Sequence, residues 1–344
     1  LAPAAGVAVS SFVSKLLSIP AVPAGVGTFI TQLITGLADD AAVRAEIGQQ
    51  VGTLVTSTLG GGPLAVAVGP QVGAAVQSLL ANPVVVTALS STLGALVPAF
   101  LSQDGVVAAL ATAAGQLATA ALDGTLPTVL PEVQAQLQAS TAIQTAAGVT
   151  VTDAATQLLS NSALLQALDT TAVSLVTGLL ADNTVQNALQ QEITDQVSKL
   201  LGGGELGQVV GTQVAAAVVG LLTNPVVSTA LVGLVDTVTQ DFFGAPGVIP
   251  ALSEAASDIA LALIGGEDLT TALAAAAAAL KANPDIDAAI GVAVGGAVTE
   301  LLSDATLWQA VDATAISLIT GLLADPTVQN ALQQEITDQV SKLL

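Results

Sequence analysis

The sequence contains no cysteine, histidine, methionine or tyrosine among its 344 residues. The lack of cysteine excludes disulfide bonds, thiolate nucleophiles and thiolate metal sites. The lack of histidine excludes imidazole bases, Ser-His-Asp triads and histidine-bound zinc, copper or haem. Acid–base catalysis would have to rest on carboxylates alone, so we predict that the protein is not an enzyme and carries no metal or cofactor.

Basic side chains are also scarce. Against 26 carboxylates stand only five cations, which gives a formal net charge of -21. The cations are Lys15, Arg44, Lys199, Lys281 and Lys342. This balance repels phosphate backbones, so a nucleic-acid partner is not expected. No glycine-rich run is followed by the lysine of a phosphate-binding loop.

Long uninterrupted apolar runs are missing, although the mean hydropathy is +0.79. Val214–Leu222, for example, is interrupted by Gly220 and lies between polar residues. A membrane-spanning helix needs about 18 to 20 predominantly apolar residues, and the runs here are too short to indicate one. The acidic balance does not indicate disorder either, because 52% of the residues are hydrophobic. The sequence begins with Leu1 rather than methionine, which is typical of a chain whose leader has been removed or whose numbering starts within the protein.

A long internal repeat is the strongest positive signal in the sequence. Residues 146–201 and 289–344 are identical at 41 of 56 positions. In the last 24 of these positions, the one difference is Asn183 against Pro326. The second copy stops where a further copy would begin, which favours a longer parent protein or a chain end that docks on the next chain.

An earlier stretch repeats at nearly the same offset. Residues 59–106 and 201–248 share a Leu-Gly-Gly-Gly start and an Asn-Pro-Val-Val segment. We therefore predict tandem copies of a unit of about 143 residues. The predicted parts are an N-terminal helix with a Pro-rich linker (1–25), a first long repeat (26–167), a second long repeat (168–310) and the start of a further repeat (311–344).

A shorter period of 21 residues runs inside the long unit. In the segment 224–243, Asn224 is a good N-cap and Pro225 suits the first helical position. Apolar residues follow at helical spacing, and Gly244 is expected as a left-handed C-cap. Each short unit thus predicts one helix of about 18 residues followed by a tight turn.

These units predict an all-α fold of tandem antiparallel helical repeats, arranged as a solenoid or an elongated helical array. Short turns favour antiparallel neighbours, so we expect 15 to 17 helices in a row. The 21-residue register slips between Leu110 and Ala147 and again between Leu252 and Ile290, which predicts one shortened unit in each long copy. The abundance of Ala, Gly, Ser and Thr predicts close contacts between helices, as in membrane proteins.

Several charges fall where they favour the helix dipole, by about 0.3–1 kcal/mol each. The acids expected near helix starts are Asp40, Asp104, Asp182, Asp304 and Asp325. The lysines expected in last turns, each within Val-Ser-Lys-Leu-Leu, are Lys15, Lys199 and Lys342. We interpret these charges as structural.

Two carboxylate pairs are the sharpest candidates for chemistry. Asp285 and Asp287 could touch a calcium ion, but no further ligands follow at the spacing of an EF-hand. Glu192 and Asp195 lie one turn apart and could act as a glycosidase pair, but no aromatic platform accompanies them. This second pair recurs as Glu335 and Asp338. We interpret the first pair as dipole-favouring acids and the second as a solvated helix face.

Two further features have structural explanations. Trp308 stands where the other copy has Leu165, and we interpret it as a packing residue rather than a ligand platform. Gly202–Gly204 could bind phosphate, but a helix C-cap and turn is the better interpretation. We therefore predict no catalytic, cofactor-binding or metal-binding residue.

Two functions fit these observations. The first is a secreted or cell-surface structural protein that associates with itself head to tail into a filament. The second is a lipid-associated helical protein, such as a carrier, coat or pore in a lipid-rich envelope. A helical-repeat binding module would need a variable face, whereas the long copies vary little.

Asn-Pro-Val helix starts, abundant Ala, Val, Leu, Gly and Thr, and few lysines resemble secreted envelope proteins of actinobacteria. The composition is similar to the Ala/Gly-rich extensions of the mycobacterial PE family, although the N-terminal Pro-Glu pair of that family is absent. The resemblance implies export to a lipid-rich cell surface, with no residue carried over.

Overall fold

In the computed structural model, every regular element of residues 2–343 is an α-helix. Within this range, side chains are described at 2–331, 333, 334 and 337. Seventeen helices are present in the described chain, within the predicted range of 15 to 17. They are α1 (Ala2–Leu17), α2 (Ala21–Asp39), α3 (Ala41–Thr58), α4 (Pro63–Ala81), α5 (Pro83–Leu101), α6 (Val106–Asp123), α7 (Leu126–Gln138), α8 (Thr141–Leu159), α9 (Ser162–Ala181), α10 (Asn183–Leu200), α11 (Gly204–Leu222), α12 (Pro225–Gly244), α13 (Val248–Ile264), α14 (Leu269–Ala282), α15 (Pro284–Ser303), α16 (Ala305–Ala324) and α17 (Pro326–Leu343).

The predicted helix starts are confirmed in atomic detail. The Asn82 side chain accepts a hydrogen bond from the backbone N–H of Val84 at 2.9 Å, and Pro83 opens the helix. Asn224, Asn283 and Asp325 accept equivalent bonds before a proline. These side chains satisfy N–H groups that the first turn leaves unpaired.

Two other details of the helix ends can be compared with the sequence. The short helices α7 and α14 lie where the 21-residue register slips, as predicted. Gly244 is not the left-handed residue expected after α12. The helix extends to Gly244, and the positive φ of 90° occurs at Gly247, which caps the start of α13.

The helices form two compact units. Unit 1 comprises residues 1–40, 81–167 and 241–292, and unit 2 comprises 41–80, 168–240 and 293–344.

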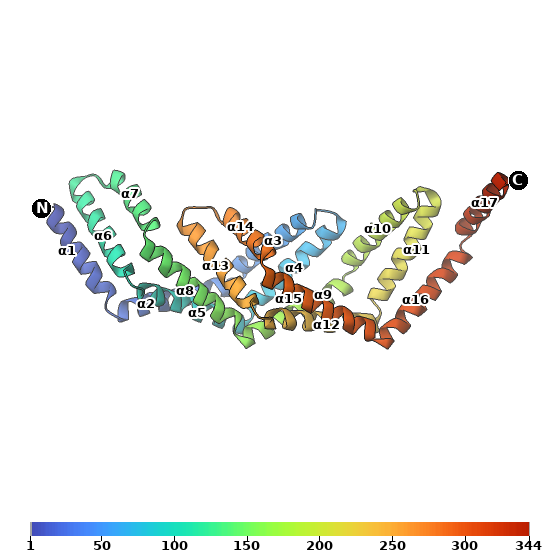
Figure 1. Ribbon diagram of the computed structural model, residues 1–344, viewed down its shortest axis with the longest axis horizontal. Helices are drawn as coiled ribbons and strands as arrows, with labels where there is room; N and C mark the ends of the chain where they lie inside the picture. The colour runs from blue at the N-terminus through green and yellow to red at the C-terminus, as the bar shows by residue number, and fades with distance from the viewer. Residues whose placement is uncertain (1, 344) are drawn as a thin grey trace. The chain divides into compact units, whose positions relative to one another are not determined.

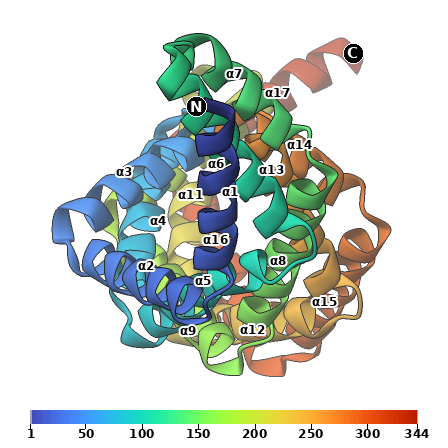
Figure 2. The same cartoon turned by 90° about the vertical axis from the view of Figure 1, so that its left-hand side faces the viewer.

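Within each unit, the largest interfaces join helices that are not always consecutive. In unit 1, α1 packs along α6 and α2 packs along α5, as Figures 1 and 2 show, whereas α1 and α2 scarcely contact each other. In unit 2, α3 packs on α4 and α10 packs on α11. The expected row of antiparallel neighbours therefore does not describe α1 and α2, which pack mainly on α6 and α5. At the crossings of α1 with α6 and of α2 with α5, the helices meet through small residues.

Glycine and threonine build the three crossings of α1–α6, α2–α5 and α3–α4. In the last of these, Gly52 faces Gly69, and a β-carbon at Gly52 would lie 2.8 Å from the Gly69 carbonyl oxygen. The Thr56 hydroxyl lies within hydrogen-bonding distance of the Gly52 carbonyl, at 2.9 Å, and of the Ala65 carbonyl on α4, at 3.2 Å. Thus a Gly-x-x-x-Thr sequence on one helix covers a glycine on the other.

The same arrangement recurs at the other two crossings. Thr31 bridges to carbonyls of α2 and α5, and Thr119 bridges to carbonyls of α6 and α1. Backbones that approach this closely are typical of small-residue helix pairs.

Because the interfaces are built from small residues, the core holds few large side chains. Among the described residues, the buried apolar set consists mainly of alanines, and the largest side chains with almost no exposure are Val106, Val248 and Ser253. Many valines, leucines, isoleucines and phenylalanines are exposed instead. The fold therefore buries the close contacts between helix backbones and leaves many large apolar side chains exposed.

Candidate functional site

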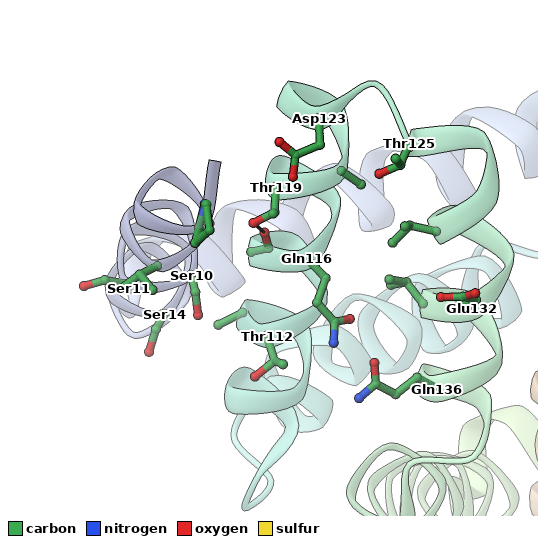
Figure 3. A pocket seen from close by; sticks show the side chains of 18 of the residues that line it. Ser10, Ser11, Ser14, Thr112, Gln116, Thr119, Asp123, Thr125, Glu132 and Gln136 are labelled. Atoms are coloured by element: carbon green, nitrogen blue, oxygen red, sulfur yellow. Dashed lines mark hydrogen bonds between the residues drawn. The ribbon is translucent and has the colours of Figure 1, made fainter. Parts of the chain in front are cut away.

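A groove of about 910 Å³ in unit 1 lies between α1, α6 and α7 (Figure 3). Its floor is the crossing of Gly6 on α1 with Gly115 on α6. Small residues at this crossing leave space above the backbone, and the neighbouring polar side chains line that space. Those labelled in Figure 3 are Ser10, Ser11, Ser14, Thr112, Gln116, Thr119, Asp123, Thr125, Glu132 and Gln136.

This groove offers hydroxyls, amides and two carboxylates. Gln116 of α6 and Gln136 of α7 point toward each other across it, and the buried Gln116 Oε1 accepts no hydrogen bond within the described chain. Asp123 and Glu132 supply negative charge, and its lining includes no lysine or arginine. Its hydroxyls and amides can hydrogen-bond a neutral polar group.

A second groove in unit 1, of about 660 Å³, occupies the matching position on α8 and α13. Gly148, Val149 and Thr152 line it as Gly6, Val7 and Ser10 line the first, each 142 residues earlier. The repeat of the sequence thus produces a repeat of the groove. The polar side chains that line the two grooves differ, so the repeat reproduces the groove but not its chemical groups.

The predicted carboxylate candidates do not gather into a site. Asp285 lies against Gly247 at the start of α13, where its negative charge favours the dipole of that helix. The Glu192 carboxylate accepts a hydrogen bond from Gln196 at 2.9 Å, and Asp195 is exposed. Among the described residues, no three acids lie close enough to hold a metal ion. Glu335, Asp338 and Lys342 lie outside the described side chains.

A carboxyl pair that the sequence did not reveal lies between α9 and α12 in unit 2. The pKa of Asp169 is raised above its ordinary value of 3.8, first by burial, then by a hydrogen bond with Asp236, and then by the charge of Asp236. Asp236 occupies the position of Gly94 in the earlier copy. The pair therefore places two acids where the earlier copy has a close contact between glycines Gly27 and Gly94.

Capping carboxylates shift in the opposite direction. Backbone N–H groups of Val185 and Thr184 lower the pKa of Asp182, and a bond from Gln71 lowers it further. The Gln71 side chain donates to Asp182 at 2.6 Å, and Gln213 donates to Asp325 at 3.2 Å. The second contact lies one long unit after the first in the sequence, and both contacts join helices of the fold. Hydrogen bonds lower the pKa of the capping residues Asp268 and Asp304 in the same way.

Trp308 and the triple glycine both have structural contacts. The Trp308 indole donates a hydrogen bond to the Leu302 carbonyl at 3.0 Å, and 46% of the side chain is exposed. Gly202–Gly204 all adopt positive φ, and the Gly203 N–H bonds to the Ser198 carbonyl at the end of α10. The glycines join α10 to α11 in a tight turn.

Nine helices of the described chain are long enough and apolar enough to cross a membrane, judged by length and composition. They are α2, α4, α5, α6, α9, α11, α12, α15 and α16. The expectation that the apolar segments are too short is therefore wrong. Ser, Thr and Gly interrupt the apolar runs, but the mean hydropathy of these nine helices stays at 1.2 or above. In α16, none of the apolar window is buried.

No family model, no curated protein and no solved structure matches this chain.

Proposed function

We propose that this chain is a non-enzymatic structural protein of the cell surface, secreted and built as a solenoid of tandem helical repeats. It associates with further copies head to tail into a filament or surface assembly. The observation that carries this proposal is the amount of apolar surface that the chain leaves uncovered.

The exposed area supports this proposal quantitatively. The chain exposes 18,931 Å². A compact monomer of 33.5 kDa would expose about 12,700 Å², and two separate compact domains of half that mass would expose about 15,000 Å². Exposed large apolar side chains contribute to the excess, among them Ile316 and Ile319 on α16, at 66% and 57% exposure. Burying such side chains favours an assembly by about 25 cal/mol per Å², before the entropic cost of association is subtracted.

Light scattering and negative-stain imaging over a range of concentrations test this proposal. We expect the mean mass to rise with concentration and Ile316→Ser/Ile319→Ser to weaken the association. Thr320→Ser, on the same exposed helix, is the matched control and should leave it unchanged. A monomer of unchanged mass at high concentration would refute the proposal.

A lipid partner is the second candidate, favoured by the nine long apolar helices. With a net charge of -21, the chain is repelled by anionic headgroups, so neutral lipid is the expected partner. Flotation with phosphatidylcholine vesicles tests this candidate, and vesicles that contain phosphatidylglycerol should bind less protein. Absence of the protein from both vesicle fractions would exclude lipid.

A further inference from the structure

The groove between α1, α6 and α7 in unit 1 presents hydrogen-bond acceptors that lack donors. The buried Gln116 Oε1 accepts no hydrogen bond within the described chain. The Thr112 hydroxyl donates to the Ala108 carbonyl at 2.8 Å, and the Thr119 hydroxyl donates to the Gly115 carbonyl at 3.0 Å. Because a hydroxyl has a single proton, both threonines can only accept a further bond from a ligand. The groove therefore suits a ligand that donates hydrogen bonds.

The charges along the groove favour the same kind of ligand. Asp123 of α6 and Glu132 of α7 line it, and the residues that line it include no lysine or arginine. An aliphatic ammonium group has three donors, no acceptor and a positive charge. Such a group can satisfy the Gln116 oxygen and is attracted to the carboxylates, whereas an anion would be repelled by them.

The acceptors lie toward two ends of the groove. Gln116 and Asp123 are two turns apart on α6, which separates them by about 10 Å along the helix axis. On α7, Gln136 points toward Gln116 (Figure 3). Val133 and Val129 line the groove one and two turns before Gln136, in the direction of Asp123. The groove therefore has a polar group near each end and apolar side chains along one wall.

We propose that this groove binds a linear aliphatic diamine or polyamine, with one ammonium group at Gln116 and another at Asp123. Its methylene chain lies along Val129 and Val133. A lysine side chain carries one ammonium group and would reach only one of the two ends. The volume of about 910 Å³ lies in the range of sites for small molecules.

The second groove of unit 1 lacks this pair of ends. On α13, Leu261 takes the position of Thr119, and Gly265 takes the position of Asp123. The chemistry of the first groove is therefore not a copy that the repeat carries along. Amine binding by this groove is separate from self-association and goes beyond it.

Isothermal titration calorimetry of the full chain tests the proposal, in about 0.15 M salt to screen nonspecific attraction. Octamethylenediamine should bind at one saturable site. It should bind about tenfold tighter than putrescine, which has the same charge but a chain too short to join the two ends. The diacetylated form of octamethylenediamine keeps the methylene chain and loses both charges, so it should not bind.

Substitutions at the two ends locate the site. Gln116→Leu should weaken the binding of octamethylenediamine about tenfold. It should not lower the midpoint of urea denaturation, because the Gln116 Oε1 has no partner in the free chain. Asp123→Asn should weaken binding about threefold. Asp241→Asn is the matched control, since Asp241 is also an exposed residue of unit 1 in the last turn of a helix, but lies outside the groove. It removes the same charge and should leave binding unchanged.

Absence of saturable binding, equal affinity for the two diamines, or binding of the diacetylated form would overturn the proposal. Equal effects of Asp123→Asn and Asp241→Asn would also overturn it, because binding would then follow the overall charge of the chain. Asp123 is exposed, so this comparison holds even if Gln116→Leu does not fold. Light scattering of the chain without amine tests self-association separately.

Discussion

The Gly52–Gly69 crossing allows a prediction in which one substitution has opposite effects at two sites. Gly52→Ala places a β-carbon 2.8 Å from the Gly69 carbonyl oxygen and 3.2 Å from its carbon, both of which are backbone atoms. A flexible side chain could rotate away, but backbone atoms require the two helices to separate. Gly233→Ala is the matched control in the same unit, because Gly233 lies within α12 and faces open space.

The expected magnitudes follow from two competing effects. Alanine in place of glycine within a helix stabilises by about 0.5–1 kcal/mol, because the unfolded chain loses conformational freedom. At Gly233 only this gain applies. At Gly52, overpacking costs about 1–3 kcal/mol and loosens the neighbouring Thr56 bonds. The net change at Gly52 is therefore a loss of up to about 2.5 kcal/mol.

Urea denaturation followed by circular dichroism measures both variants against the parent chain. We expect the midpoint to fall for Gly52→Ala and to rise for Gly233→Ala, with similar slopes. Equal shifts of the same sign would refute the argument, since they would mean that helix propensity outweighs the close backbone contact. A stabilised Gly52→Ala variant would show that α3 and α4 do not meet at this glycine.

Further predictions concern hydroxyl and carboxyl groups. Thr56→Val should destabilise by about 1 kcal/mol in urea because it removes the hydroxyl between two helices, whereas Thr53→Val, at an exposed position, should have little effect. Asp182→Asn keeps a capping oxygen but loses the charge. Because folding lowers the pKa of Asp182, the parent should be more stable than the variant above pH 3.8. In thermal melts, this difference in stability should disappear as the pH falls through the lower pKa of the folded state. Asp169→Asn should have the opposite pH dependence, because folding raises the pKa of Asp169. The variant should be more stable than the parent at neutral pH and should lose this difference in acid. An equal change in melting temperature at both pH values would contradict the pairing with Asp236.

Local structure was largely predictable because it depends on residues close in sequence. Asn224 followed by Pro225 specifies a helix start through hydrogen bonds that span two or three residues, and the structure contains that bond. The register slips predicted the two short helices for the same reason. The pairing of helices was not predictable, because the Gly-x-x-x-Thr sequences are short and their partners lie many residues away. Asp169 and Asp236 illustrate this limit, since neither residue belongs to a local motif that points to the other.

The grooves and the exposed apolar side chains have a common physical origin in the small-residue interfaces. A helix that packs through glycine brings two backbones together and buries little side-chain volume. Large apolar side chains on its other faces therefore remain exposed. In a leucine-rich bundle those side chains would fill the interior of the same chain. Duplication of the unit multiplies the available faces and also supplies helices that match them, as α8 and α13 do in unit 1.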